Sequence, residues 1–183
     1  MRLARAGGVP VPEVHDVDGR DMVLERVDGP TMLTALTSRP WQVASQVQTL
    51  VELHRLVHRV PAPGWLRPTL GTGQSLLHLD LHPANIILSS DGPVLLDWQG
   101  AAGGEAATDL ALTYLLLRTS TVPGRAGQRV IGRLGQFAFA ALFRAAAGAS
   151  SVDSQLRAVA RRRLADPTLL PQEASRIRRM LPR

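Results

Sequence analysis

The most constraining feature of this sequence is an H-x-D-x-x-x-x-N segment, His78 to Asn85, followed twelve residues later by Asp97. Short apolar runs of strand type lie at 76–79, 86–88 and 94–96, and the turn residues SSDG at 89–92 predict a hairpin between the last two. The pattern therefore places an aspartate and an asparagine in one loop, and a second aspartate at the end of a hairpin strand.

This order of polar residues is typical of phosphoryl-transfer chemistry. Asp80 is the candidate general base, or the group that orients an attacking hydroxyl, because phosphoryl transfer depends more on positioning than on strong basicity. Asn85 and Asp97 offer one neutral and one anionic oxygen ligand, a set suited to Mg²⁺. His78 lies two residues before Asp80, so in an extended segment both side chains would share one face, and we expect His78 to brace the loop.

Lysine is absent from the chain, since all 21 basic residues are arginine, and the net charge is +6. The lysine that contacts the ATP phosphates in such enzymes is therefore missing from these residues. Much of the arginine excess falls in residues 151–183, which we interpret as solvated helical surface. Aromatic residues make up only 4% of the chain, so base-stacking platforms are scarce and the composition argues against a nucleic-acid partner.

Composition also excludes several classes of protein. No apolar run approaches the roughly 18 residues that suggest a membrane span, and the first residues lack the apolar core of a signal peptide. The absence of cysteine excludes disulfides, thiol catalysis and Cys-ligated zinc. We therefore expect a cytoplasmic protein without a membrane partner, with one domain large enough to bury a substantial core.

The remaining elements follow from periodicity and turn residues. Residues 9–30 predict a hairpin, because each residue before a proline is pushed into an extended conformation and turn residues stand at 16–20. Thr31 is expected to cap a short helix, and residues 40–58 are clearly amphipathic. Beyond Gly104 we expect helices at about 106–118, 126–148, 152–164 and 171–181. The expected fold class is α+β and mostly helical.

The motif segments 77–88 and 94–98 resemble the aminoglycoside phosphotransferase and choline kinase family, above all its small bacterial members. Flanking segments are also similar to the family. Residues 8–12 resemble the segment that leads into its fourth strand, and residues 23–29 resemble its hinge. Residues 50–54 resemble its long helix below the catalytic loop. Residues 107–111 resemble a later motif whose aspartate braces that loop. The resemblance covers residues 8–118, and the last third agrees only in being helical.

The resemblance implies a protein-kinase-like fold in two parts. Residues 1–29 would be a remnant of the N-lobe β-sheet with the hinge, and residues 30–183 the helical C-lobe with the catalytic loop and metal-binding hairpin. The implied reaction is transfer of the γ-phosphate of ATP or GTP to a hydroxyl of a small molecule, with Mg²⁺ held by Asn85 and Asp97. The backbone of Glu25, Arg26 and Val27 would receive the purine.

Other residues take supporting roles under the same resemblance. Asp109 would brace the catalytic loop. Apart from the resemblance, we expect His82 to support that loop, and Trp98 either to shape the acceptor pocket or to pack in the core. The stretch 59–75, which helps to build the acceptor site in larger members, is short here, so the resemblance does not name the acceptor.

The chain also departs from the family. The nucleotide-covering loop, the lysine strand and the helix with its glutamate partner would all precede residue 1, so we interpret the sequence as N-terminally truncated. The strand at 22–27 would then lack its neighbours and leave an unpaired sheet edge, through which we expect the chain to form a homodimer or to be poorly soluble.

Two alternatives stay open at this point. With no lysine and no covering loop, the chain could be a non-catalytic module that binds a Mg-nucleotide or another small ligand. A lesser alternative is a metal-dependent hydrolase, in which His78, Asp80 and His82 alternate along an extended strand and present three ligands on one face. The hydrolase hypothesis leaves Asn85 and Asp97 unexplained.

Overall fold

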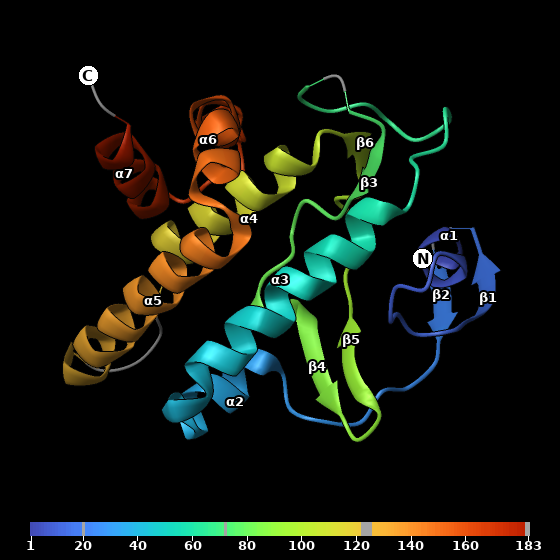
Figure 1. Cartoon of the computed structure of the whole chain (residues 1–183), viewed down its shortest axis with the longest axis horizontal. Coiled ribbons are helices and arrows are strands. Elements are labelled where there is room, and N and C mark those ends of the chain that lie inside the picture. Colours follow the sequence, from blue (N-terminus) through green and yellow to red (C-terminus); the bar gives the residue numbers. More distant parts are fainter. Residues whose placement is uncertain (20, 72, 122–125, 182–183) are drawn as a thin grey trace.

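The computed structural model describes residues 1–19, 21–71, 73–121 and 126–181, without the side chains of 126–131. The fold is mixed α/β and mostly helical, as the sequence predicted. Figure 1 shows helices α4 to α7 gathered on one side and a small hairpin on the other, with α3 and a second hairpin between them. Arg20, in the turn predicted at 16–20, lies outside the described residues.

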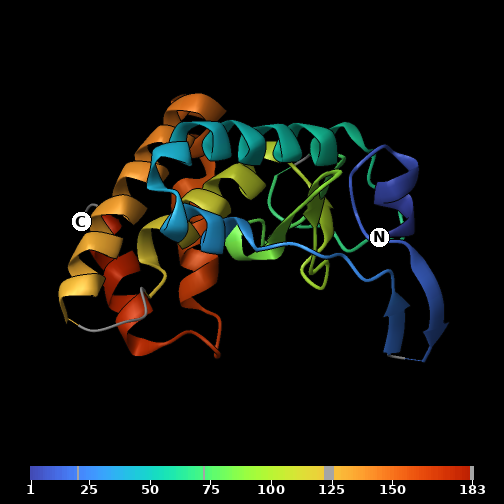
Figure 2. The same ribbon diagram turned by 90° about the horizontal axis from the view of Figure 1, so that it is seen from below.

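The N-terminal part consists of α1 (Arg2–Ala6) and an antiparallel hairpin of β1 (Val14–Asp18) and β2 (Asp21–Leu24). Buried Val9 and Val11 attach this part to the rest of the chain, and Leu95 N donates a 2.8 Å hydrogen bond to Pro10 O. The hairpin itself projects from one end of the molecule, as Figure 2 shows.

The second strand of the N-terminal hairpin is shorter than the sequence predicted, because it ends at Leu24 rather than Val27. The chain then passes close to the central hairpin. Gly29 has φ +148°, and a Cβ on it would lie 2.4 Å from Leu88 O. Only glycine fits this close approach with a positive φ, so the chain leaves the strand before the Asp28-Gly29-Pro30 turn.

Two helices follow the hinge segment. Thr31 caps α2 (Met32–Ser38), because its Oγ1 accepts a 3.1 Å hydrogen bond from Thr34 N. After a 3₁₀ turn (Pro40–Gln42), α3 (Val43–Arg59) runs along one long side of the molecule (Figure 2). Its buried side chains repeat at helical spacing and face the core: Val47, Leu50, Val51, Leu53, His54 and Val57.

The central strands form two separate antiparallel pairs. The predicted hairpin consists of β4 (Ile86–Ser89) and β5 (Gly92–Leu95), directly after a 3₁₀ turn at Pro83–Asn85. The other pair joins β3 (Ser75–Leu77) to β6 (Ala102–Gly104). Glycine allows the close packing around this pair, since a Cβ on Gly104 would lie 2.6 Å from Thr69 Cγ2.

Four helices complete the chain: α4 (Ala106–Thr119), α5 (Ala126–Ala147), α6 (Ala149–Leu164) and α7 (Pro171–Met180). Helix α4 contacts α5, α6 and α7, so it lies at the centre of this group. It also contacts β3, which ends just before the loop that contains Asp80. Among the described residues, none of the helices is long and apolar enough to cross a membrane.

Candidate functional site

The loop that contains Asp80 has no strand partner of its own, so its backbone groups need other partners. Helix α4 supplies them. Asp109 Oδ2 accepts a 3.0 Å hydrogen bond from His78 N, and its Oδ1 accepts a 2.8 Å bond from Leu79 N. One helical turn later, Thr113 Oγ1 donates a 2.8 Å bond to Leu81 O. A single helix face therefore holds both sides of the loop around Asp80.

Asp109 is fully buried, and two histidines of α3 lie against its carboxylate. His58 Nε2 donates a 3.1 Å hydrogen bond to Asp109 Oδ2, and His54 Nδ1 lies 3.6 Å from the same oxygen. Burial alone would raise the pKa of Asp109, but the two imidazoles hold it well below its ordinary value. Asp109 is therefore a carboxylate, which can accept both backbone bonds of the loop.

His54 is buried with no hydrogen-bond partner on either ring nitrogen among the described residues. Burial lowers its pKa, and the nearby Asp109 only partly opposes that effect. The ligand atoms of His54, His58 and Asp109 lie within 4.8 Å of one another, a spacing that metal sites also have. Because Asp109 already accepts hydrogen bonds from the loop, we assign the cluster to loop support.

His78 links Asp80 to the segment after β5 that contains Asp97. Its Nε2 donates a 2.9 Å hydrogen bond to Leu96 O, and its Nδ1 accepts a 3.2 Å bond from Asp80 N. One nitrogen donates and the other accepts, so the ring is neutral. Burial, the largest influence, lowers the pKa of His78 and favours the same neutral form.

The expectation that His78 and Asp80 share one face is wrong. Leu79 between them has φ +61°, so the segment is not extended, and β3 already ends at Leu77. His78 is fully buried, whereas the Asp80 side chain is 39% exposed. With both ring nitrogens engaged, His78 has no atom free to contact a substrate, and its place in the structure is that of a brace.

The Asp80 carboxylate is oriented by its own loop. Asn85 Nδ2 donates 3.0 Å hydrogen bonds to both Asp80 O and Asp80 Oδ2. His82 Nδ1 accepts a 3.2 Å bond from Ala84 N, and its Nε2 lies 3.5 Å from Asp80 Oδ1. Asp80 thus keeps a fixed direction while remaining open to solvent.

Asn85 and Asp97 flank the β4–β5 hairpin: Asn85 directly precedes β4, and Asp97 lies two residues after the end of β5. Leu96 N donates a 2.8 Å hydrogen bond to Asn85 O, which brings the residue before Asp97 beside Asn85. Asp97 is exposed, with φ +58°. The side-chain nitrogen of Asn85 donates to Asp80, so the side-chain oxygen of Asn85 is left to bind a metal ion together with the Asp97 carboxylate. These hard oxygen donors fit Mg²⁺.

The hydrolase alternative does not fit this geometry. It requires His78, Asp80 and His82 to present free ligand atoms on one face of a strand. Both nitrogens of His78 are engaged with the backbone, and the positive φ of Leu79 interrupts the strand. These three residues therefore form no metal site.

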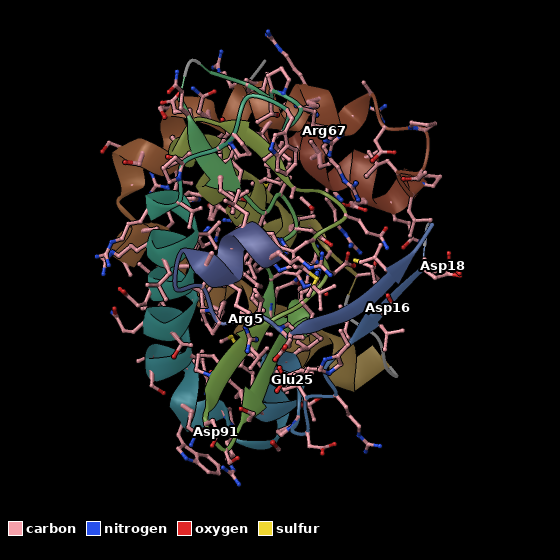
Figure 3. All side chains as sticks on the ribbon, turned by 90° about the vertical axis from the view of Figure 1, so that its right-hand side faces the viewer. Arg5, Asp16, Asp18, Glu25, Arg67 and Asp91 are labelled. Atoms are coloured by element: carbon pink, nitrogen blue, oxygen red, sulfur yellow. The ribbon has the colours of Figure 1, made fainter. Side chains whose placement is uncertain are left out.

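The predicted hinge residues lie apart from the loop. Glu25 N donates a 2.8 Å bond to Glu13 O, and Arg26 pairs with Asp28 at 3.0 Å on the exposed surface. Glu25 Oε2 also lies 3.6 Å from Arg5 Nη1, and Figure 3 shows these two residues side by side. The backbone donor of Glu25 is thus already engaged. The purine contact predicted for Glu25, Arg26 and Val27 stays a prediction.

Trp98 packs against the loop. Its ring lies edge-on to His78 with 4.7 Å between centroids, and its Nε1 donates a 3.4 Å bond to Leu95 O. It does not line the cavity next to Asp80, so the geometry gives no support to the acceptor-pocket role expected for it.

A cavity of about 370 Å³ opens beside Asp80. Its walls come from the Asp80 loop, the segments before β3 and before β6, α4 and α6, and include Asp80, Gly100, Arg67, Thr69, Arg162 and Arg163. Sequence reasoning missed the arginines of this cavity, as well as Thr113 and His58. Thr113 and His58 stand four residues after Asp109 and His54, so the helical repeat signalled them.

Replacement of Asp109 by asparagine tests the loop support. The amide NH₂ of asparagine would face N–H groups that now donate hydrogen bonds to the carboxylate. Because two donors cannot bond to each other, we expect Asp109→Asn to lower the free energy of unfolding by about 3 kcal/mol. Asp91→Asn, on the exposed hairpin turn, should change it by less than about 0.5 kcal/mol. Urea denaturation of both variants measures the difference, and equal effects would contradict the assigned role.

Stability should also fall on mild acidification. Burial lowers the pKa of His54 and His78 from 6.5, so their neutral forms stabilise the fold fully above about pH 6.5. That stability is lost as the pH falls below this value, by up to about 1.4 kcal/mol per pH unit for each imidazole. Denaturation between pH 7.5 and 5 should show a smaller slope in His54→Gln, whereas His15→Gln on the exposed hairpin should keep the wild-type slope.

Comparison with known proteins agrees with the motif. Residues 64–148 match the model of the phosphotransferase enzyme family, and this range contains Asp80, Asn85, Asp97 and Asp109. A solved structure of a choline/ethanolamine kinase family protein from Mesorhizobium loti is similar, with 17% identity and a TM-score of 0.45 over 97% of this chain and 82% of that one. A search of curated proteins gave no match. Residues 64–148 of this chain are thus similar to the phosphotransferase enzyme family, in agreement with the family resemblance of the sequence motifs.

Proposed function

We propose that this chain is a cytoplasmic, Mg²⁺-dependent kinase that transfers the γ-phosphate of ATP or GTP to a hydroxyl of a small molecule. One observation carries the proposal: a buried carboxylate, Asp109, fixes a loop that presents Asp80 to solvent beside the oxygen donors Asn85 and Asp97. If these polar residues only capped turns, the loop would need neither a buried carboxylate at Asp109 nor two solvent-exposed acids at Asp80 and Asp97.

Each residue has a distinct role in the proposed reaction. Asp80 accepts the proton of the acceptor hydroxyl as its oxygen bonds to the γ-phosphorus and the bond to the bridging β–γ oxygen breaks. Asn85 orients Asp80 through its amide nitrogen, and its oxygen and the Asp97 carboxylate would hold the metal ion. When bound, Mg²⁺ neutralises the charge on the phosphate oxygens.

The two-part organisation is also a proposal, with residues 1–29 as a remnant of the N-lobe and residues 30–183 as the C-lobe. In this arrangement the purine would lie against the backbone at Glu25 to Val27. Because the chain contains no lysine, no lysine of its own contacts the phosphates, and loss of one such electrostatic contact costs about 10²–10³ in rate. The competing function is therefore a non-catalytic Mg-nucleotide binding module.

Calorimetric titration and a phosphate-transfer assay separate the two functions. We expect ATP or GTP to bind only with Mg²⁺, and Asp97→Ala to abolish that binding because it removes the anionic ligand. Asp80→Asn should bind the nucleotide like the wild type but lower the transfer rate at least about 10²-fold. Asp91→Ala serves as the control for both. Wild-type binding without any transfer would favour the binding module, and Mg²⁺-independent binding would contradict the metal site.

We also propose that the N-terminal hairpin forms a homodimer. The sheet of β1 and β2 has only two strands in the described part of the chain, so its outer edges are unpaired there. Val17, Met22 and Val23 on these strands are 48%, 53% and 58% exposed. Exposed apolar strands with free edges favour pairing with a second copy.

Light scattering tests the dimer. We expect a mass of twice the 19.7 kDa of one chain, and a single-chain mass for Val23→Glu, because the buried charge would oppose pairing. Leu33→Glu, on an equally exposed position of α2, should remain dimeric. A wild-type protein that stays at one chain mass at high concentration would contradict the proposal.

A further inference from the structure

We propose that the acceptor is an anionic alcohol, a small molecule that carries a carboxylate or phosphate group as well as its reacting hydroxyl. This inference rests on the proposed kinase function and names its substrate class. It comes from the charges around the cavity beside Asp80, which differ from those that a cationic acceptor would need.

The cavity has the size and position of an acceptor site. About 370 Å³ accommodates a small molecule, and Asp80 stands on its wall. Apolar side chains of α4 and α6 form part of the lining, including Leu112, Leu116 and Val159, and would contact the carbon skeleton of an acceptor. A hydroxyl placed against Asp80 leaves the rest of the molecule within this cavity.

Three arginines line the same cavity, but only one of them is neutralised. Arg163 pairs with Asp166 at 2.8 Å and with Glu173 at 3.4 Å. Arg67 Nη2 donates a 2.8 Å bond to the carbonyl oxygen of Gly100, and Arg162 Nη1 donates to Thr69 Oγ1. Within the described part of the chain, neither Arg67 nor Arg162 has a carboxylate within ion-pair distance.

Arg67 and Arg162 therefore place two positive charges at the cavity that no acidic side chain of its lining neutralises. Asp166 is paired with Arg163, and Asp80 is the group that receives the hydroxyl. The lining contains no aromatic side chain, so a quaternary ammonium group would find no ring face. Guanidinium groups with free donors instead suit the planar oxygens of a carboxylate or a phosphate.

Arginine is abundant throughout this chain, so the arginines of the cavity need a control from the same helix. Arg161 stands beside Arg162 on α6 and is exposed, but it does not line the cavity. Arg162 is the better variant of the two unpaired cavity arginines, because Arg67 also holds the Gly100 carbonyl and its loss would disturb the segment after Asp97.

Binding to the 183-residue chain without nucleotide tests the inference independently of catalysis. The probes are glycerate for the carboxylate and glycerol 3-phosphate for the phosphate, with choline and glycerol as the cationic and neutral counterparts, measured by ligand-observed NMR. We expect at least one anionic probe to bind more tightly than choline and glycerol, and Arg162→Gln to weaken that binding about tenfold while Arg161→Gln leaves it unchanged.

The outcomes separate this inference from the proposed function. Preference for choline, equal binding by all probes, no binding of either anion, or equal effects of the two variants would overturn the inference. Anion binding that depends on Arg162 but gives no phosphate transfer from Mg-ATP would uphold the anionic preference and refute the kinase function. The stronger of the two anionic probes identifies the recognised group as carboxylate or phosphate.

Discussion

The structure of the site depends on one buried carboxylate. Asp109 reaches from α4 to accept two backbone hydrogen bonds at the start of the Asp80 loop, while His58 donates to it from α3. A buried charge is costly unless its oxygens are hydrogen-bonded, and both oxygens of Asp109 accept hydrogen bonds. Because the two helices and the loop meet at this single group, the packing of the helical core fixes the direction in which Asp80 faces solvent.

The loop also contains backbone conformations that need such support. Leu79 and Asp97 both have positive φ, which is uncommon for residues other than glycine. His78 connects the two positions, since its ring joins the nitrogen of Asp80 to the carbonyl of Leu96. Strain of this kind persists where the surroundings over-determine the chain, and it is frequent at functional sites.

Local rules in the sequence predicted much of this arrangement. The turn residues at 89–92 predicted the β4–β5 hairpin, and the apolar repeat at 40–58 predicted α3. The motif predicted that Asp80, Asn85 and Asp97 form one group. Features that depend on distant partners could not be predicted in this way. The prediction that His78 and Asp80 share one face was wrong because the backbone of Leu79 has a positive φ and is not extended. The β3–β6 pair depends on the close approach between segments that glycine allows. The cavity arginines come from segments 95 residues apart, and nothing in either segment alone indicates that they meet.

The most direct test of this account is amide hydrogen exchange at His78 and Leu79, compared between the wild type and Asp109→Asn under native conditions. If the buried carboxylate holds the loop, both amides should be strongly protected in the wild type and exchange far faster in the variant, while amides of the β4–β5 hairpin keep their protection. Equal exchange of the two loop amides in both proteins would show that the loop does not depend on Asp109.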